Sequence, residues 1–380
     1  MADTNDGRRG QAALIRATAR RATIQDVATT AGVSVSAVSK VLRGAYGVSP
    51  QMRDRVTAAI NQLGYRPHTG ARAMRGRSFT IGVMLVDFTS PFQSEVAQGI
   101  SGHFHDTSYQ DIVVAAGDSV NRQEGAVEAL IDRQVDGLIL IAPVTSQNWL
   151  EDLGAKIPTV VIARHGGADN FDTIVDDDRA GARLVVDHLV SLGHRAIIHT
   201  SHPALGLRRP FVLSHTARCE GYVAAMQEHG LPPQVIETSY SEAGGYEAGL
   251  GAMDQRAAPT AIFAGADIAA LGVLRAVEER GLVVPQDLSV AGYDNIYAST
   301  IGRVSLTTVD QSARLTGSIA AKMVLERIKG RIASTHHVIT PQLLERATTA
   351  APSSPAELPT RGSRSRAQVK PPERTIERSA

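Results

Sequence analysis

The segment VSVSAVSKVL, residues 33–42, mixes side chains that can hydrogen-bond or carry charge with apolar ones. At helical spacing, Val38, Val41 and Leu42 fall on one side of this segment. The other side then presents small apolar, hydroxyl and amine groups outward: Val35, Ser36, Ser39 and Lys40. Such a surface can contact a polar or charged partner, or its serines can simply cap a helix and face water.

Charge is distributed unevenly along the 380-residue chain, although its net charge is only +1. Residues 1–77 hold 13 basic and 4 acidic side chains, residues 78–346 hold 20 and 31, and residues 347–380 hold 6 and 3. These segments therefore carry +9, −11 and +3. A basic head on an acidic body indicates a polyanionic partner for the head, with a solvated arginine-rich terminus as the alternative.

The cellular setting is predicted from two further features. Cys219 is the only cysteine, so no disulfide can form within the chain. No segment approaches the length of apolar sequence that a membrane-spanning helix needs. We therefore expect a soluble cytoplasmic, nucleoid-associated protein with no membrane partner.

Three short helices are predicted in the head. Thr23, Ser34 and Ser49 each precede a run with helical apolar periodicity, which is typical of helix N-caps. Gly32 and Gly64 are placed to end the first and third helices. Two short helices joined at AGVS and braced by a third predict a helix-turn-helix.

From residue 79 the hydrophobic period changes. Short apolar runs such as TIGVMLVD, DGLILIA, PTVVIAR, TAIFAGAD and LSVAGYD alternate with helical stretches such as PFQSEVAQGISGHF and DIAALGVLRAVEERG. Continuous apolar strands separated by helices indicate parallel sheets covered on both faces. The length of this region exceeds what one such sheet holds, so we predict an α/β body of two doubly wound subdomains.

The head and the body both resemble one known family. ATIQDVATTAGVSVSAVSKVLRG and VSPQMRDRVTAAINQLGYRP are similar, almost position by position, to the DNA-binding head of the lactose-repressor-like (LacI/GalR) transcriptional regulators. SLGH, DIAALG, VAGYDN and LTTVDQ resemble that family's periplasmic-binding-protein-like effector domain. The resemblance implies a sequence-specific regulator, in the first instance a repressor, that binds a pseudo-palindromic operator as a homodimer under small-molecule control.

The resemblance places the second helix of the head in the major groove of operator DNA. It implies base readout by Val35, Ser36 and Lys40, because lysine can reach guanine acceptors and valine can contact a thymine methyl. Hydroxyls and cations also bind phosphates, which positions a protein without reading sequence. The residues expected in that role are Thr23, Ser34, Ser39, Arg43, Ser49 and Arg53.

The segment HTGARAMRGRS, residues 68–78, matches the hinge helix that folds on operator binding in this family. Met74 stands where the family usually has leucine, and we expect it to enter the minor groove as an apolar wedge. Arg72 and Arg75 would supply cations beside it. The alternative is a flexible linker, and Gly70 weakens a helix by about 1 kcal/mol relative to alanine.

Ligands of open parallel sheets bind at the carboxyl ends of the strands. By this rule and by resemblance, the expected effector-binding residues are Asp87, Phe92, Arg164, Arg218, Tyr240, Asp267, Asp294 and Gln311. Arg218 and Asp294 are the best candidates for holding a polyhydroxylated ligand such as a sugar or related metabolite. Ala163 and Ala266 stand where family members commonly carry polar side chains, which departs from the pattern of an ordinary sugar site.

The predicted domain plan has five parts. They are a disordered basic arm (1–21), the helix-turn-helix domain (22–67), the hinge (68–78), the effector domain (79–347) and a disordered tail (348–380). Subdomain one is expected to comprise about 79–178 and 311–338, and subdomain two about 179–310 and 339–347.

No catalytic constellation, cofactor motif or metal-ligand spacing stands out, so we expect no enzyme activity, cofactor or metal. The run Asp176–Asp178 resembles a cation site, but a strand end or helix cap is the favoured interpretation. Two alternatives stay open for function. One is a co-repressor-dependent regulator or an activator of the same family, and the other is a soluble sugar-binding protein with a non-functional head.

Overall fold

The computed structural model describes residues 22–42, 46–65, 77–203 and 211–353. These form two compact units, residues 1–80 with 128–136 and residues 81–127 with 137–380, and each is described by itself. The expected DNA contacts at Arg43, Arg72, Met74 and Arg75 lie outside the described residues, as does the N-terminal arm.

The head consists of α2 (Ile24–Ala31), α3 (Val35–Leu42) and α4 (Pro50–Leu63). Each begins after a residue that was predicted to cap it, and glycines with left-handed φ end α2 and α4. The three helices share one small core, built from Val27, Ala28, Ala31, Val38, Val56, Ala59 and Tyr65. The predicted helix-turn-helix is therefore confirmed.

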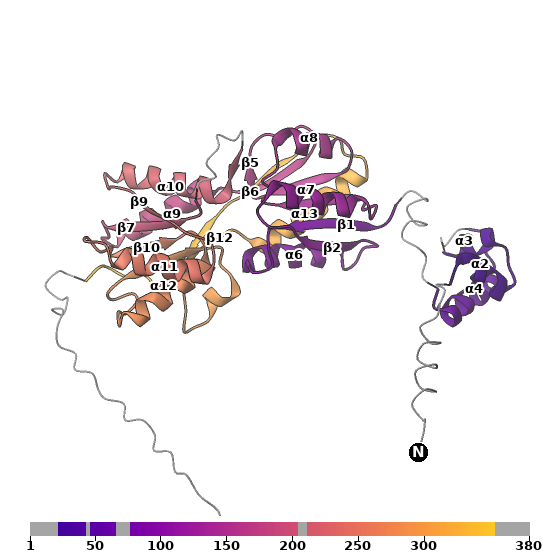
Figure 1. The fold of residues 1–380 in the computed structure, drawn as a ribbon, viewed down its shortest axis with the longest axis horizontal. Helices are drawn as coiled ribbons and strands as arrows, with labels where there is room; N and C mark the ends of the chain where they lie inside the picture. The colour runs from indigo at the N-terminus through magenta and orange to yellow at the C-terminus, as the bar shows by residue number, and fades with distance from the viewer. Residues whose placement is uncertain (1–21, 43–45, 66–76, 204–210, 354–380) are drawn as a thin grey trace, which may run out of the picture. The chain divides into compact units, whose positions relative to one another are not determined.

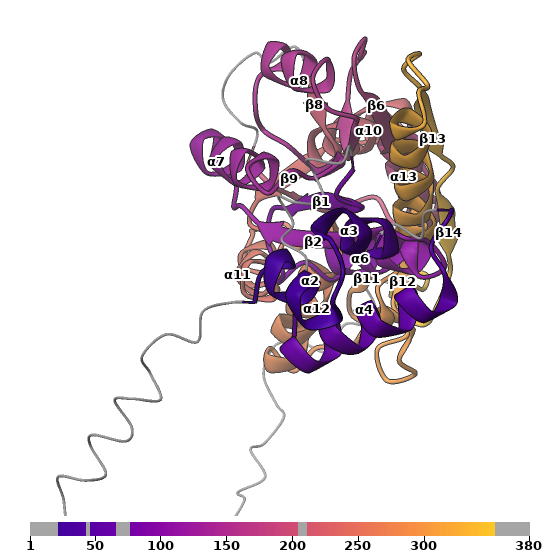
Figure 2. The same ribbon diagram turned by 90° about the vertical axis from the view of Figure 1, so that its right-hand side faces the viewer.

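The first sheet of the body has six strands in the order β13-β6-β4-β3-β1-β2. Their bounds are β1 Thr80–Leu85, β2 Gln110–Ala115, β3 Gly137–Ile141, β4 Thr159–Ile162, β6 Asp172–Asp176 and β13 His336–Ile339. The helices are α6 Pro91–Phe104, α7 Val120–Ile131, α8 Gln147–Gly154 and α13 Ala313–Ile328. α6 and α13 pack together on one face, and Figure 2 shows α8 on the other side of the sheet from α13.

The second sheet also has six strands, in the order β14-β12-β11-β10-β7-β9. They are β7 Ile197–Ser201, β9 Gln234–Glu237, β10 Ala261–Ala264, β11 Ser289–Tyr293, β12 Thr307–Asp310 and the antiparallel β14 Gln342–Leu344. The helices are α9 Asp178–Ser191, α10 Ser214–Glu228, α11 Glu242–Met253, α12 Asp267–Glu279 and the short 3₁₀ helix η1 Tyr297–Thr300. α9 and α10 cover one face and α11 and α12 the other (Figure 1).

The chain passes between the two sheets three times, after β6, after β12 and after β13. A small antiparallel pair, β5 (Arg164–His165) and β8 (Val212–Leu213), adds a further connection between the two halves. Two doubly wound parallel sheets with helices on both faces confirm the predicted fold class. Both sheets bring the carboxyl ends of their central strands to the connections between them, where a ligand site is expected.

Residues 348–353 are bonded to the second sheet, whereas the tail was expected to be disordered from residue 348. The backbone N–H of Val290 donates to the carbonyl of Thr348 (2.8 Å), and that of Ala350 donates to the hydroxyl of Ser289 (3.1 Å). The composition argument was wrong here because backbone groups and small hydroxyls can hold a segment without regular secondary structure against a sheet, even without large apolar side chains. The rest of the tail lies outside the described residues.

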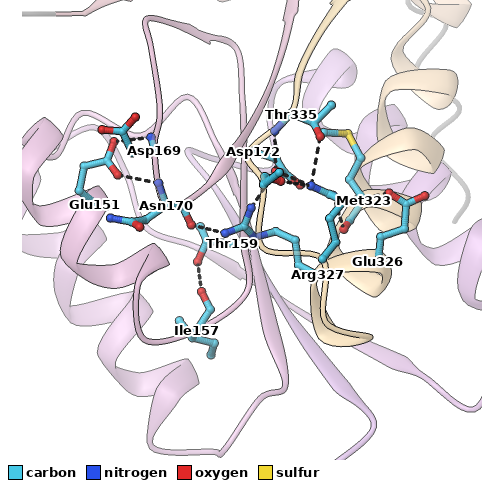
Figure 3. A network of polar contacts seen from close by, with 12 residues as sticks. Glu151, Ile157, Thr159, Asp169, Asn170, Asp172, Met323, Glu326, Arg327 and Thr335 are labelled. Carbon is cyan, nitrogen blue, oxygen red and sulfur yellow. Dashed lines mark hydrogen bonds and ion pairs between the residues drawn. The ribbon is translucent and has the colours of Figure 1, made fainter.

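Asp172, at the start of β6, is the centre of a buried ionic network (Figure 3). It is fully buried, and its carboxylate accepts hydrogen bonds from Arg327 (2.9 Å) and Arg331 (2.6 and 3.0 Å) and from the backbone N–H of Thr335 (3.0 Å). The network ties the C-terminal end of α13 and the segment leading to β13 to the first sheet.

Candidate functional site

The head presents one polar face on α3. Val38 is fully buried against α2 and α4, whereas Val35, Ser36 and Lys40 are exposed. Apolar packing thus fixes one side of α3 and leaves the opposite side free for a partner. The structure brings the three predicted base-reading residues together on this exposed side.

Several predicted phosphate ligands also serve as helix caps. Thr23 forms a reciprocal capping box with Asp26, and Ser49 accepts from the backbone N–H of Met52 (3.3 Å). Ser34 accepts from Ala37 (3.2 Å) and lies 3.0 Å from the hydroxyl of Ser36. A hydroxyl that only accepts a backbone bond keeps a donor proton for a phosphate oxygen, as at Ser49. The hydroxyl of Thr23 already donates to the Asp26 carboxylate (2.7 Å), so a phosphate would have to compete with that bond. Ser39 is partly buried and Arg53 is exposed.

An acidic side chain that sequence analysis did not identify anchors the chain just before β1. Asp136 accepts from the backbone N–H and hydroxyl of Ser78 (2.7 and 3.0 Å) and from the backbone N–H of Phe79 (2.7 Å). Phe79 has a left-handed φ of 55°, a conformation that is costly for a bulky residue and needs such support. The sequence feature that could have indicated this anchor is the position of Asp136 directly before the apolar run of β3.

The body contains a cavity of about 760 Å³ lined by both halves. Its described lining from the first half includes Val86, Asp87, Ser90, Phe92, Gln93, Asp118, Ile141, Val144 and Ala163. From the second half and the connections come His202, Leu213, Ser214, His215, Arg218, Ser239, Tyr240, Ala266, Ile268, Asp294 and Gln311. Six of the eight predicted effector-binding residues therefore lie on one cavity: Asp87, Phe92, Arg218, Tyr240, Asp294 and Gln311.

The structure does not bring Arg164 to this cavity. Its guanidinium donates to the carbonyls of Pro143 (3.1 Å) and Thr145 (2.7 Å) and to the side chain of Gln147 (3.0 Å). The guanidinium carbon also lies 3.4 Å from the ring centroid of Phe211. These contacts bury Arg164 and give it a structural role. The rule that ligands bind at the carboxyl ends of strands therefore did not predict the place of this side chain.

Asp267 is also absent from the cavity lining. It is fully buried, and its carboxylate accepts from Thr308 (2.5 Å), Ser299 (2.6 Å) and the backbone N–H of Ile296 (3.0 Å). Burial raises the pKa of Asp267 to about 6, against the opposing effect of these hydrogen bonds. With its oxygens satisfied by the protein, Asp267 holds η1 and β12 in place.

Arg218 forms the charged part of the cavity wall while remaining 3% exposed. It donates to Asp178 (2.8 Å) and to the carbonyl of Gly265, and its guanidinium carbon lies 3.5 Å from the ring centroid of Tyr293. Burial opposes its charge, but Asp178 and other neighbours raise the pKa of Arg218 above its ordinary value. Arg218 is therefore a fixed cation with a fixed counter-ion.

Asp294 and Gln311 form a second polar pair at the cavity, with the Gln311 amide donating to the Asp294 carboxyl group. Burial raises the pKa of Asp294 well above its ordinary value. Asp294 also has a left-handed φ of 119°, which is uncommon outside glycine. Backbone strain of this kind is common at ligand sites, and Asp294 lies directly after β11, in the lining of the cavity.

An aromatic cluster on the second half of the cavity was largely missed by sequence analysis, which had named Tyr240 alone. The ring centroids of His202 and Tyr240 are 4.4 Å apart, and those of His202 and His215 are 5.3 Å apart. Burial lowers the pKa of His215 to about 4 and also lowers that of His202, so both rings are neutral at pH 7. His202 directly follows β7, so the strand-end rule could have found it.

The three aspartates of the run 176–178 lie in different environments. Asp177 caps α9 by accepting from Ala180, and Asp178 is fully buried between Arg218 and His165. Asp176 is buried at the end of β6. Across the described part of the chain, no three His, Cys, Asp or Glu side chains come together in a group that could hold a metal ion.

Both the head and the body are similar to known proteins. Residues 23–68 match the model of bacterial regulatory proteins of the lacI family, and residues 186–349 match a periplasmic binding protein-like domain. The HTH-type transcriptional repressor PurR of Glaesserella parasuis is 31% identical over 329 residues, which cover 85% of this chain and 95% of that protein. Catabolite control protein A of Priestia megaterium is 31% identical over 328 residues, covering 85% and 97%.

The chain belongs to the lacI family of bacterial regulatory proteins. A solved structure of the lac repressor dimer bound to operator and the anti-inducer ONPF is similar over 87% of this chain and 100% of that one, at 28% identity and a TM-score of 0.75. The lacI-family assignment confirms the predicted resemblance. The protein is a DNA-binding transcriptional regulator controlled by a small-molecule effector.

The two candidate sites of this lacI-family regulator differ in how sequence reveals them. The exposed face of α3 follows from local helical periodicity, whereas the cavity of the body depends on contacts between distant segments. Among helices in the described ranges, none combines the length and hydrophobicity needed to cross a membrane.

Proposed function

We propose that this regulator is a repressor that binds a pseudo-palindromic operator as a homodimer, with one α3 helix in the major groove of each half-site. The proposal rests on the exposed face of α3, where Val35, Ser36 and Lys40 lie opposite the buried Val38. Lys40 is the one long polar side chain of this face and would read guanine acceptors. A regulator that acts on chromosomal DNA would work in the cytoplasm, at the nucleoid.

Contacts to the DNA backbone would position this face without reading bases. We assign them to the exposed or capping side chains Thr23, Ser34, Ser49 and Arg53, together with the partly buried Ser39 and with Arg43. Met74, flanked by Arg72 and Arg75, would enter the minor groove at the operator centre. Since the readout face is chemically sparse, DNA deformability at that centre would contribute much of the specificity.

The effector would bind in the 760 Å³ cavity against Asp87, Phe92, Arg218, Tyr240, Asp294 and Gln311. A sugar or related metabolite is the proposed class. Because residues of both halves line the cavity, a ligand can favour one arrangement of the halves over another. It shifts operator affinity only by its differential affinity for the two states.

Selection of bound duplexes from a random library tests the DNA-binding proposal. We expect a palindromic consensus that is lost or relaxed in Lys40→Ala and retained in Lys322→Ala, which removes an exposed lysine from α13. Equal affinity for every duplex at each salt concentration would instead favour a sugar-binding protein with a non-functional head.

A thermal-shift screen of sugars, nucleosides and related metabolites identifies the effector, and operator titration with and without it gives the sign of regulation. Weaker operator binding with effector supports an inducible repressor. Stronger binding would support the alternative of a co-repressor-dependent regulator.

A further inference from the structure

The cation on the cavity wall is matched by a buried carboxylate that the cavity does not expose. We propose that Asp178 neutralises Arg218 and so makes this wall select an uncharged polar group of the effector and reject an anionic one. The inference rests on the proposed function, since it names the chemistry of the ligand group that meets Arg218.

The contacts of Arg218 leave it little to offer an anion. One terminal nitrogen donates to Asp178 (2.8 Å) and the other to the carbonyl of Gly265, while Nε is buried with no hydrogen-bond partner among the described residues. The ring of Tyr293 covers one face of the guanidinium at 3.5 Å. The remaining N–H groups can donate to a hydroxyl or carbonyl oxygen, which needs no counter-charge.

Asp178 is held where it cannot turn away from Arg218. It is fully buried, and its second oxygen lies 2.8 Å from Nε2 of His165 on β5. Asp178 also begins α9, directly after the chain leaves the first sheet. The counter-charge is therefore fixed by the fold rather than by a mobile surface residue.

The other groups on this side of the cavity add no free positive charge. Burial lowers the pKa values of His202 and His215, and it raises the pKa of Asp294 well above its ordinary value, so none of these groups adds a positive charge beside Arg218. Arg218 is the only arginine or lysine among the described lining residues. An anion would thus lose its hydration against a wall with no net positive charge, with the Asp178 carboxylate directly behind Arg218.

Asp178→Asn tests the proposal because it removes the counter-charge and keeps the shape and an acceptor oxygen. Benzoate and benzamide are a matched pair of flat probes that differ in charge. Their binding to the purified full-length chain can be followed by saturation-transfer NMR and by thermal shift at constant ionic strength. We expect the ratio of benzoate to benzamide affinity to rise at least tenfold in Asp178→Asn relative to the wild type.

The double variant Asp178→Asn/Arg218→Met removes both charges and serves as the second arm should the single variant fail to fold. We expect its preference between the two probes to match that of the wild type, whether or not either probe binds strongly. Benzoate binding by the wild type that disappears in the double variant would overturn the proposal. An unchanged ratio in a folded Asp178→Asn variant would overturn it too.

These measurements use no DNA, so their outcome is separate from that of the operator selection. If the selection yields no operator but benzoate affinity rises in Asp178→Asn, the proposed DNA-binding function is wrong and the role of Asp178 stands. If an operator is selected but the benzoate to benzamide ratio does not change, the proposed function stands and the inference about Asp178 is wrong.

Discussion

The hydroxyl of Tyr293 donates a hydrogen bond to the carboxyl group of Asp176, and this bond joins the end of β11 to the end of β6. The two strands belong to different sheets, so the bond lies where the two halves of the body meet. Burial, reinforced by the nearby Asp178, raises the pKa of Asp176 from 3.8 to about 7. The connection between the halves is therefore sensitive to protons near neutral pH.

The stability of Asp176→Asn, measured as its free energy of unfolding, should rise relative to that of the wild type as pH rises. The folded wild type holds a proton on Asp176 that the unfolded chain releases near pH 4, so this group's contribution to stability is complete below about pH 4 and is lost as pH rises through about 7. Asparagine has no such dependence. We expect the difference in unfolding free energy to change by about 1–2 kcal/mol between pH 5.5 and 8.

Thermal or urea unfolding at several pH values measures this difference. Asp152→Asn, an exposed aspartate of α8, is the matched control and should give a constant difference from the wild type. A constant difference for Asp176→Asn as well would mean that Asp176 is ionised throughout this pH range.

Asp172→Asn should strongly destabilise the body. It leaves Arg327 and Arg331, which are 7% and 23% exposed, without their shared counter-charge (Figure 3). Removing one partner of a buried ionic group costs about 3–5 kcal/mol because the remaining charge stays buried. The midpoint of urea unfolding measures the loss.

Glu228→Gln provides the contrast, because its pair with Arg183 is exposed on both sides. Water and salt screen such a pair, so little change in the urea midpoint is expected. Equal effects of the two substitutions would show that burial does not decide the strength of these ion pairs.

The head was predictable because its signals are local. Caps such as Thr23 and Ser49 and the buried stripe around Val38 depend on residues three or four positions apart, and the structure places them as expected. The strand and helix alternation of the body was readable for the same reason.

The partners of the cavity residues were not predictable in the same way. Arg164 and Asp267 follow strands, but their hydrogen bonds go to carbonyls and hydroxyls that only the folded chain brings near. Sequence also gave no sign that Asp178 would pair with Arg218, 40 residues further along. A strand-end rule locates the region of a ligand site and does not decide which side chains remain free to bind.

Asp136→Ala should weaken operator binding while leaving binding to the effector cavity unchanged. The substitution removes the acceptor for Ser78 and Phe79, so the segment that leaves the hinge loses its fixed conformation and must be ordered on DNA. Hydrogen bonds to a charged group contribute about 1.5–3 kcal/mol, which corresponds to a loss of about tenfold or more in operator affinity.

Gel-shift titration and a thermal shift with the identified effector separate these two effects. Asp132→Ala, an exposed aspartate four positions earlier, is the control and should bind operator as the wild type does. Full operator affinity in a folded Asp136→Ala variant would exclude a role for this anchor in DNA binding.

Arg53→Ala should weaken binding to all duplexes by a similar factor. Arg53 is exposed in the first turn of α4 and is assigned to a phosphate, so its removal lowers affinity and leaves base preference intact. The slope of log affinity against log salt should fall in magnitude by about 0.9 for each phosphate that Arg53 neutralises. Arg55→Ala is the matched control, because this exposed arginine lies two positions along the same helix and therefore points in nearly the opposite direction. The same change in slope for Arg55→Ala would mean that total charge, rather than a specific interaction of Arg53, drives the association.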